Sequence, residues 1–203
     1  MTCRPSADGV GPGGAEFASL IEALRRVLDA ASLSAPSSQD ARRAVAHLNQ
    51  ASDLLAGWRQ DQSERITGRR DDLPGRGNPL LPAFRVFRFS NVEVRARVTF
   101  TEAFLGRGSV HGGVLPLLFD DVLGHLANVE RAHSRTAFLH VDYRALTPIG
   151  QEVTLQADVD RIEGRKRFLS GRLLDGEKTL VEARGLFVEL KPEHQASWAA
   201  GLG

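Results

Sequence analysis

The chain has 203 residues, enough for one large domain or for a domain of ordinary size with an extension. Hydrophobic residues make up 42% and charged residues 25%, which is typical of a folded globular protein and excludes an intrinsically disordered chain. The formal net charge of +1 gives no basis for expecting a nucleic-acid or anionic-membrane partner. The single cysteine, Cys3, excludes an internal disulfide and a cysteine-based zinc site.

The two ends of the chain carry few structural signals. The N-terminus lacks the charged-then-apolar pattern of a secretion signal, and no apolar stretch approaches the length of a membrane span. A cytoplasmic protein without a membrane span is therefore expected. Residues 1–14 contain Gly, Pro and Ser and are expected to be disordered, and a loose tail with Trp198 is expected at residues 192–203.

Two amphipathic helices are predicted near the N-terminus. Apolar residues recur at helical spacing over residues 15–31 and again over about 39–58, where either Ser37 or Ser38 is the expected N-cap. Together they form a helical extension over residues 1–60. Because a hairpin of two helices cannot bury both apolar stripes alone, we expect it to dock on the sheet or on a partner subunit. His47, within the second helix, is expected to have a surface or packing role.

A sheet is predicted in the second half of the chain. Residues 61–82 are charged, with Gly and Pro, and are expected to be a linker before a domain over residues 83–191. In that domain the hydrophobic period changes to two, which is typical of half-buried strands. The expected strands lie at residues 84–89, 92–100, 137–145, 153–160, 167–174 and 179–190. One helix followed by four consecutive meandering strands predicts an antiparallel sheet and an α+β fold class.

A glycine-rich turn leads into the predicted central helix over residues 108–124, GSVHGGVLPLLFDDVLG. Such a turn leaves backbone N–H groups at the helix start without intrahelical partners, and these groups can hold a developing oxyanion. Asp120 lies inside the apolar run, where a buried carboxylate needs a partner or a task. The alternative is a simple glycine turn with Asp120 and Asp121 on a solvated helix face.

The run VHGGVLPLLFDDVLG resembles the His-Gly-Gly signature of hotdog-fold acyl-CoA thioesterases, in the phenylacetyl-CoA thioesterase-type branch of the 4-hydroxybenzoyl-CoA thioesterase superfamily. Downstream, TAFLHVDYR at residues 136–144 and TPIG at 147–150 look like the next strand and turn of the same family. The resemblance covers roughly residues 83–190. It implies a sheet wrapped around one central helix, in a homodimer or a dimer of dimers. In such assemblies the glycine turn of one subunit faces the acidic residue of its neighbour.

The resemblance also implies the roles of individual residues. Backbone N–H groups of Gly112 or Gly113 would hold the thioester oxyanion. Asp120, nine residues after His111, matches the catalytic acidic residue, as the nucleophile or as the base that activates water. Thr136, sixteen residues further on, matches the Ser or Thr that orients the attacking group. His111 would support the turn and help to polarise the carbonyl, and a purely structural role is the alternative.

Two further positions affect the expected site. Many relatives carry an asparagine six residues before the histidine, whereas this chain has Leu105, so one side-chain contribution is absent. Arg165, Lys166 and Arg167 resemble a basic turn that relatives present to the phosphates of coenzyme A. The alternative for these three residues is a solvated hairpin tip.

The expected function is hydrolysis of an acyl-CoA thioester to free acid and CoA in lipid metabolism, with no metal or redox cofactor and with coenzyme A as part of the substrate. The main alternative is a hotdog protein that binds acyl-CoA or lipid without hydrolysing it. A third hypothesis is that the N-terminal helices dock onto another protein. Double-bond hydration is disfavoured, because Asp120 and His125 are five residues apart on a continuous predicted helix and so point to different faces.

Overall fold

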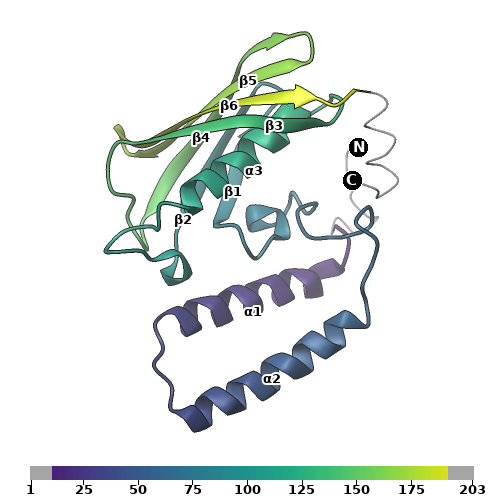
Figure 1. Ribbon diagram of the computed structural model, residues 1–203, viewed down its shortest axis with the longest axis vertical. Coiled ribbons are helices and arrows are strands. Elements are labelled where there is room, and N and C mark those ends of the chain that lie inside the picture. Colours follow the sequence, from purple (N-terminus) through teal and green to yellow (C-terminus); the bar gives the residue numbers. More distant parts are fainter. Residues whose placement is uncertain (1–10, 192–203) are drawn as a thin grey trace.

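The computed structural model describes residues 11–191, which form a six-stranded antiparallel sheet, a central helix and two N-terminal helices (Figure 1). The predictions made for Cys3, for most of residues 1–14 and for the tail with Trp198 lie outside these residues. The sheet has the order β1-β2-β4-β5-β6-β3. Its strands are β1 (Ala83–Phe89), β2 (Glu93–Thr99), β3 (Ser134–Tyr143), β4 (Glu152–Glu163), β5 (Lys166–Asp175) and β6 (Lys178–Glu189).

The predicted meander of four consecutive strands is wrong at one connection, because β3 pairs with β6 and β4 pairs with β2. The connection after β3 explains the difference. The N–H groups of Arg144 and Ala145 both donate to Leu180 O at the start of β6, at 2.8 and 3.0 Å. Five residues after Ala145, the N–H of Gly150 donates to the carbonyl oxygen of Phe100 at 2.8 Å, and Phe100 directly follows the last residue of β2. The chain therefore crosses from one edge of the sheet to its middle between these two contacts.

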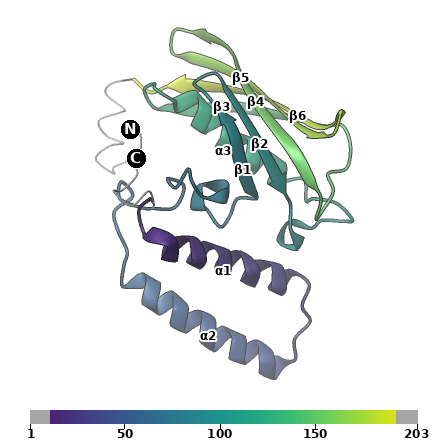
Figure 2. The same ribbon diagram turned by 180° about the vertical axis from the view of Figure 1, so that it is seen from behind.

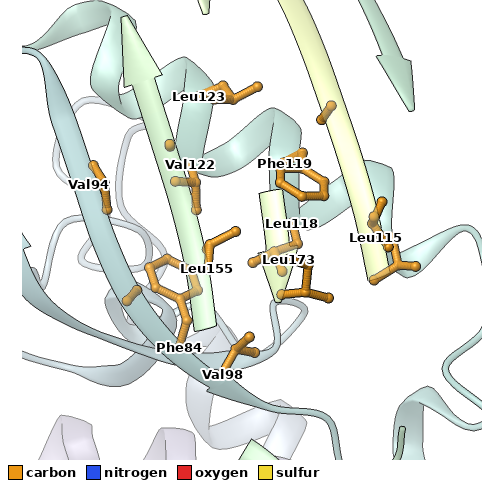
Figure 3. Packing of buried hydrophobic residues seen from close by; sticks show 14 of the residues in the cluster. Phe84, Val94, Val98, Leu115, Leu118, Phe119, Val122, Leu123, Leu155 and Leu173 are labelled. Atoms are coloured by element: carbon orange, nitrogen blue, oxygen red, sulfur yellow. The ribbon is translucent and has the colours of Figure 1, made fainter. Parts of the chain in front are cut away.

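The central helix α3 (Val114–Asn128) lies against the concave face of the sheet, and this confirms the predicted α+β hotdog arrangement (Figures 1 and 2). Its side chains at residues 115, 118, 119, 122, 123, 126 and 127 are buried. They pack with Phe84, Val98, Leu155 and Leu173 from four different strands (Figure 3). Burial of this apolar arc dominates the stability of the domain, at roughly 25 cal/mol for each Å² of apolar surface removed from water.

The first N-terminal helix, α1 (Gly14–Ser32), docks on segments that flank the sheet, whereas docking on the sheet itself or on a partner subunit was expected. Ile21 on its inner face is buried, Asp29 accepts a hydrogen bond from Ala103 N–H at 3.1 Å, and Arg25 donates to Pro74 O and Asn78 O at 3.0 Å each. Ala103 belongs to the short helix η2 (Glu102–Phe104), and Pro74 to η1 (Pro74–Gly77).

The second N-terminal helix, α2 (Ser38–Ala56), has no buried residue, and its apolar side chains Val45, Leu48, Leu54 and Leu55 are exposed. Ser37 is its N-cap, because the Ser37 hydroxyl accepts a hydrogen bond from Asp40 N–H at 3.2 Å. Figures 1 and 2 show that α1 lies between α2 and the hotdog domain. His47 is exposed on α2, away from the sheet, consistent with its expected surface role.

The segment expected as a linker, residues 61–82, is partly packed against its surroundings. Leu81 belongs to the hydrophobic core, and the side chain of Arg70 is buried. The Arg70 guanidinium pairs with Asp72 at 2.7 Å and donates to the carbonyl oxygens of Pro12 and Gly14. This segment therefore connects the start of α1 to the domain that follows.

Replacing Leu118 with Ala should lower the free energy of unfolding by about 2–5 kcal/mol, because the residue is fully buried and the neighbouring side chains fill the cavity only in part. Leu80→Ala is the matched control, since Leu80 is exposed and should change the free energy by less than about 0.5 kcal/mol. Urea denaturation of both variants measures the difference. Equal losses in the free energy of unfolding of the two variants would show that burial of α3 side chains does not stabilise the core.

Candidate active site

The two adjacent carboxylates of α3 lie in different surroundings. Each residue of an α-helix advances the side-chain direction by about 100°, so Asp120 and Asp121 flank the buried arc on opposite sides. Asp120 is exposed and faces β3, where its Oδ1 accepts a hydrogen bond from Thr136 Oγ1 at 2.8 Å. Asp121 faces the loop that contains Arg76, and its Oδ1 accepts from the Arg76 guanidinium at 2.6 Å.

The more deeply buried carboxylate is thus Asp121, whose side chain is 19% exposed, rather than Asp120, in contrast to the expectation from the sequence. The reason is that the Arg76 loop covers one flank of the helix, which periodicity cannot indicate. Burial raises the pKa of Asp121, the Arg76 charge opposes this shift, and the neighbouring charge of Asp120 adds to it. Asp121 Oδ2 has no hydrogen-bond partner among the described residues. Asp121 is therefore held in an internal ion pair, and Asp120 is the carboxylate that faces solvent.

The glycine turn before α3 is fixed by two side chains. His111 Nδ1 accepts a hydrogen bond from Gly113 N–H at 3.1 Å, and Tyr143 Oη donates to Gly112 O at 2.9 Å. These two bonds hold the peptide unit between Gly112 and Gly113 at both ends. The histidine thus supports the turn as an acceptor, and a neutral ring in this arrangement carries its proton on Nε2.

The backbone N–H of Gly112 makes no hydrogen bond with any of residues 11–191, whereas that of Gly113 is occupied by His111. The sequence did not distinguish between Gly112 and Gly113 as the oxyanion donor. In the structure the Gly112 N–H is the one that can still donate a hydrogen bond to a substrate. A Cβ at position 112 would lie 3.7 Å from the Tyr143 ring, so a side chain there would fill space beside this amide.

Within one chain the available amide and the carboxylate are far apart. Gly112 precedes α3 and Asp120 follows eight residues later, which corresponds to about 12 Å along a helix that rises 1.5 Å per residue. The carbonyl carbon and oxygen of a thioester are bonded to each other, so groups that act on them have to lie within a few ångströms. Gly112 N–H and the Asp120 carboxylate of one chain are therefore too far apart to contact the same carbonyl group.

Arg165, Lys166 and Arg167 do not lie together at the surface. Arg165 and Lys166 are exposed at the turn between β4 and β5, and Arg165 donates to Glu189 O at 2.9 Å. The Arg167 side chain is only 3% exposed, and its guanidinium donates to two backbone carbonyls and to the Glu189 carboxylate. Arg167 therefore ties the end of α3 to β6, and the exposed candidates for phosphate contacts are Arg165 and Lys166.

Leu105 lies beside the glycine turn. It forms an isolated antiparallel bridge with Val110, and the preceding carbonyl, Phe104 O, accepts from His111 N–H at 2.8 Å. Its side chain is exposed. An apolar group thus occupies the position at which the family resemblance implied an amide.

The contacts of Tyr143 and Arg76 were not anticipated from the sequence. Tyr143 lies in the motif TAFLHVDYR, but its hydroxyl contact with Gly112 depends on the pairing of β3 with β6. Arg76 lies in the segment expected as a linker. Two consecutive residues there, Gly75 and Arg76, have φ angles of +57° and +52°, in the left-handed region. Such a conformation is uncommon for arginine, and it directs the side chain toward Asp121.

A cavity of about 250 Å³ adjoins the Arg76–Asp121 pair. Its lining includes Arg76, Asp71 and His125 on the polar side, and Phe84 and Phe89 on the apolar side. His125 therefore lies on the flank of α3 opposite Asp120, which agrees with the expectation that these two side chains point to different faces. The pKa of His125 is lowered to about 4, mainly by burial and also by the charge of Arg76, while the charge of Asp71 opposes the shift.

Comparison with known proteins agrees with this architecture. A sheet wrapped around one central helix, entered through a glycine turn, defines a hotdog-fold protein. The Thioesterase superfamily model matches residues 107–182. The crystal structure of protein RHA08564, a thioesterase superfamily protein, is 31% identical and superposes with a TM-score of 0.73 over 87% of this chain and 96% of that chain. The chain therefore belongs to the thioesterase superfamily.

Curated relatives match a shorter region. Acyl-coenzyme A thioesterase THEM4 from Bos taurus is 35% identical over 92 residues, which are 44% of this chain and 38% of that protein. The protein of the same name from Mus musculus is 36% identical over 88 residues, 42% of this chain and 38% of that protein. The chain thus spans well under half the length of these relatives.

No helix within residues 11–191 is long and apolar enough to cross a membrane. In the same residues, no group of three or more His, Cys, Asp or Glu side chains is placed to hold a metal ion.

Replacing His125 with Gln should make stability less sensitive to acid. The folded state keeps His125 neutral until about pH 4, whereas the unfolded chain takes up the proton near the ordinary value of 6.5. As the pH falls between these two values, the unfolded state binds more protons and stability is lost, up to about 3 kcal/mol from this group. Below pH 4 both states are protonated and the loss from His125 ends.

Denaturation midpoints at several pH values between 7 and 4 measure this difference. His47→Gln is the matched control, because His47 is exposed on α2. The account predicts a flatter profile for His125→Gln only. Parallel profiles for the wild type and both variants would show that His125 titrates normally in the folded protein.

Proposed function

We propose that the protein is an acyl-CoA thioesterase that hydrolyses an acyl-CoA thioester to a free acid and CoA. The observation that carries the proposal is the hydrogen bond from Thr136 to Asp120, which holds an exposed carboxylate in place on a hotdog helix. The similarity to acyl-coenzyme A thioesterase THEM4 supports acyl-CoA as the substrate class. Such an activity would place the protein in lipid metabolism, acting on a substrate in aqueous solution.

The proposed chemistry uses one amide and one carboxylate. The Gly112 N–H donates to the thioester oxygen as negative charge develops on it, and His111 and Tyr143 hold the turn that presents this amide. Asp120 accepts a proton from a water molecule that adds to the carbonyl carbon, or attacks that carbon itself and forms an anhydride that water then cleaves. In both versions the carbon–sulfur bond breaks and the CoA sulfur leaves as a thiolate that takes up a proton.

Thr136 orients the carboxylate for this step. Its hydroxyl donates to Asp120 Oδ1, so the other oxygen, Oδ2, remains available for the reaction. Arg165 and Lys166 are exposed cations at the β4–β5 turn and are the proposed contacts for the phosphates of the CoA part of the substrate. No metal or redox cofactor is needed for these steps.

We further propose that the active unit is a homodimer, alone or within a dimer of dimers, because one chain separates Gly112 from Asp120 by about 12 Å. The outer edge of β3 is the candidate interface. Within residues 11–191, β3 pairs with β6 alone, and large apolar side chains near this edge are exposed, namely Leu105, Leu117, Phe138, Tyr143 and Leu146. A second copy paired along β3 would cover them and would bring the glycine turn of one chain toward the Asp120 of the other.

The second candidate function is binding of acyl-CoA or a lipid without hydrolysis. Leu105 favours it, because an exposed apolar side chain beside the glycine turn cannot donate a hydrogen bond to a thioester. Tight binding of acyl-CoA with no thiol release for any acyl group would support this function. A partner protein docked on the exposed stripe of α2 would account for that helix under either function.

Replacing Asp120 with Asn should lower kcat by at least about 100-fold, since the amide neither attacks nor accepts the proton. Thiol release from short-chain, aryl and long-chain acyl-CoAs measures the rate and identifies the preferred acyl group. Asp121→Asn is the control at the neighbouring position and should retain most of the activity, because Asp121 is held by Arg76. Equal losses in both variants would contradict the assignment of Asp120.

Replacing Phe138 with Glu should convert the dimer into a monomer, because the substitution places a charge on the proposed apolar interface. Sedimentation velocity measures the oligomeric state of the variant and of the wild type. Leu54→Glu is the control, as Leu54 is also apolar and exposed but lies on α2. A wild-type protein that sediments as a monomer would overturn the dimer proposal.

A further inference from the structure

A groove with a volume of about 480 Å³ lies between α1 and the hotdog domain, apart from the proposed active site. Side chains of α1 form one wall, residues 72–74 form another, and Arg85 from β1 completes it. Both α1 and β1 lie outside residues 107–182, which the superfamily model matches. The volume is within the usual range of small-molecule sites, roughly 300–1,000 Å³.

Three guanidinium groups meet at this groove. Arg25 and Arg26 are consecutive residues of α1, and Arg85 lines the groove from β1. Arg25 is anchored by its bonds to Pro74 O and Asn78 O, and its Nε is buried without an acceptor among the described residues. The guanidinium groups of Arg26 and Arg85 make no hydrogen bond or ion pair with any of residues 11–191. Most N–H groups of the three guanidinium groups therefore donate to no acceptor within the described residues.

The carboxylates beside the groove do not neutralise this charge. Asp72 lines the groove, but both of its oxygens are bound by the Arg70 guanidinium at 2.7 Å. Glu22 is the other acidic residue in the lining, so three cations face one uncommitted anion. Burial lowers the pKa of Arg25, the charge of Glu22 opposes this shift, and the charge of Arg85 adds to it. Like charges are thus held close together in the folded protein.

We propose that this groove binds the phosphate monoester group of a small metabolite, with the organic part of the ligand on the half-buried apolar side chains of Leu73 and Pro74. A phosphate monoester carries close to two negative charges at neutral pH and accepts paired hydrogen bonds from planar guanidinium groups. Arg25 is fixed in advance by the protein, and Arg26 and Arg85 complete the contact from either side. The site does not depend on the proposed hydrolysis.

Calorimetric titration of the full-length protein with adenosine 3′-phosphate tests this site, with adenosine as the ligand that lacks the phosphate. The double variant Arg26→Gln/Arg85→Gln should bind adenosine 3′-phosphate at least fivefold more weakly than the wild type. The matched control is Arg42→Gln/Arg43→Gln, which removes the same charge from exposed positions of α2 and should leave the affinity within twofold. Arg26→Lys/Arg85→Lys keeps the charge and should retain part of the affinity.

Two further ligands distinguish the sources of the phosphate. If the 3′-phosphate of coenzyme A is the natural group, CoA should bind the double variant more weakly, and dephospho-CoA should bind both proteins alike. If the natural ligand is a free nucleotide, only adenosine 3′-phosphate should bind the double variant more weakly than the wild type, and CoA should bind both proteins alike. Equal binding of adenosine and adenosine 3′-phosphate, or an equal loss in the α2 control, would overturn the proposal. Because binding is measured directly, failure of thioester hydrolysis leaves the test unaffected.

Discussion

Burial of one arc of α3 against the concave face of the sheet is the constraint on which the rest of the structure depends. Because seven side chains of this helix are buried, the helix cannot rotate without exposing them. That fixed rotation places Asp120 toward β3 and Asp121 toward the Arg76 loop. The same helix begins at the glycine turn, so its position also determines where the Gly112 amide points. The candidate site is thus a consequence of core packing.

Much of the fold could be predicted from hydrophobic periodicity. The helical period of residues 15–31, the period of two in β2 and β4, and the long apolar run after the glycine turn identified these elements correctly. The pairing of β3 with β6 could not be predicted, because the hydrogen bonds of Arg144 and Ala145 to Leu180 depend on where the chain leaves the sheet. Periodicity describes an element and carries no information about its neighbour in the sheet.

The site residues were predictable to a lesser degree. The family motif indicated Asp120 and Thr136, and the structure joins these two side chains by a hydrogen bond. Periodicity alone did not separate Asp120 from Asp121, because the two flank the buried arc symmetrically and only the Arg76 loop distinguishes them. Arg167 was expected in an exposed basic turn like that of relatives or at a solvated hairpin tip, yet its side chain is buried and three acceptors compensate for this burial. Compensation of this kind involves residues 22 to 40 positions away, which a local pattern does not show.

In the proposed enzyme two chains share each site, so that Gly112 of one acts with Asp120 of the other. Heterodimers of Asp120→Asn and Gly112→Val chains, isolated through two different affinity tags, test it most directly. One of the two sites in such a dimer is intact and the other carries both substitutions, so the account predicts about half of the wild-type thiol release. A heterodimer no more active than the two homodimeric variants would contradict the shared site.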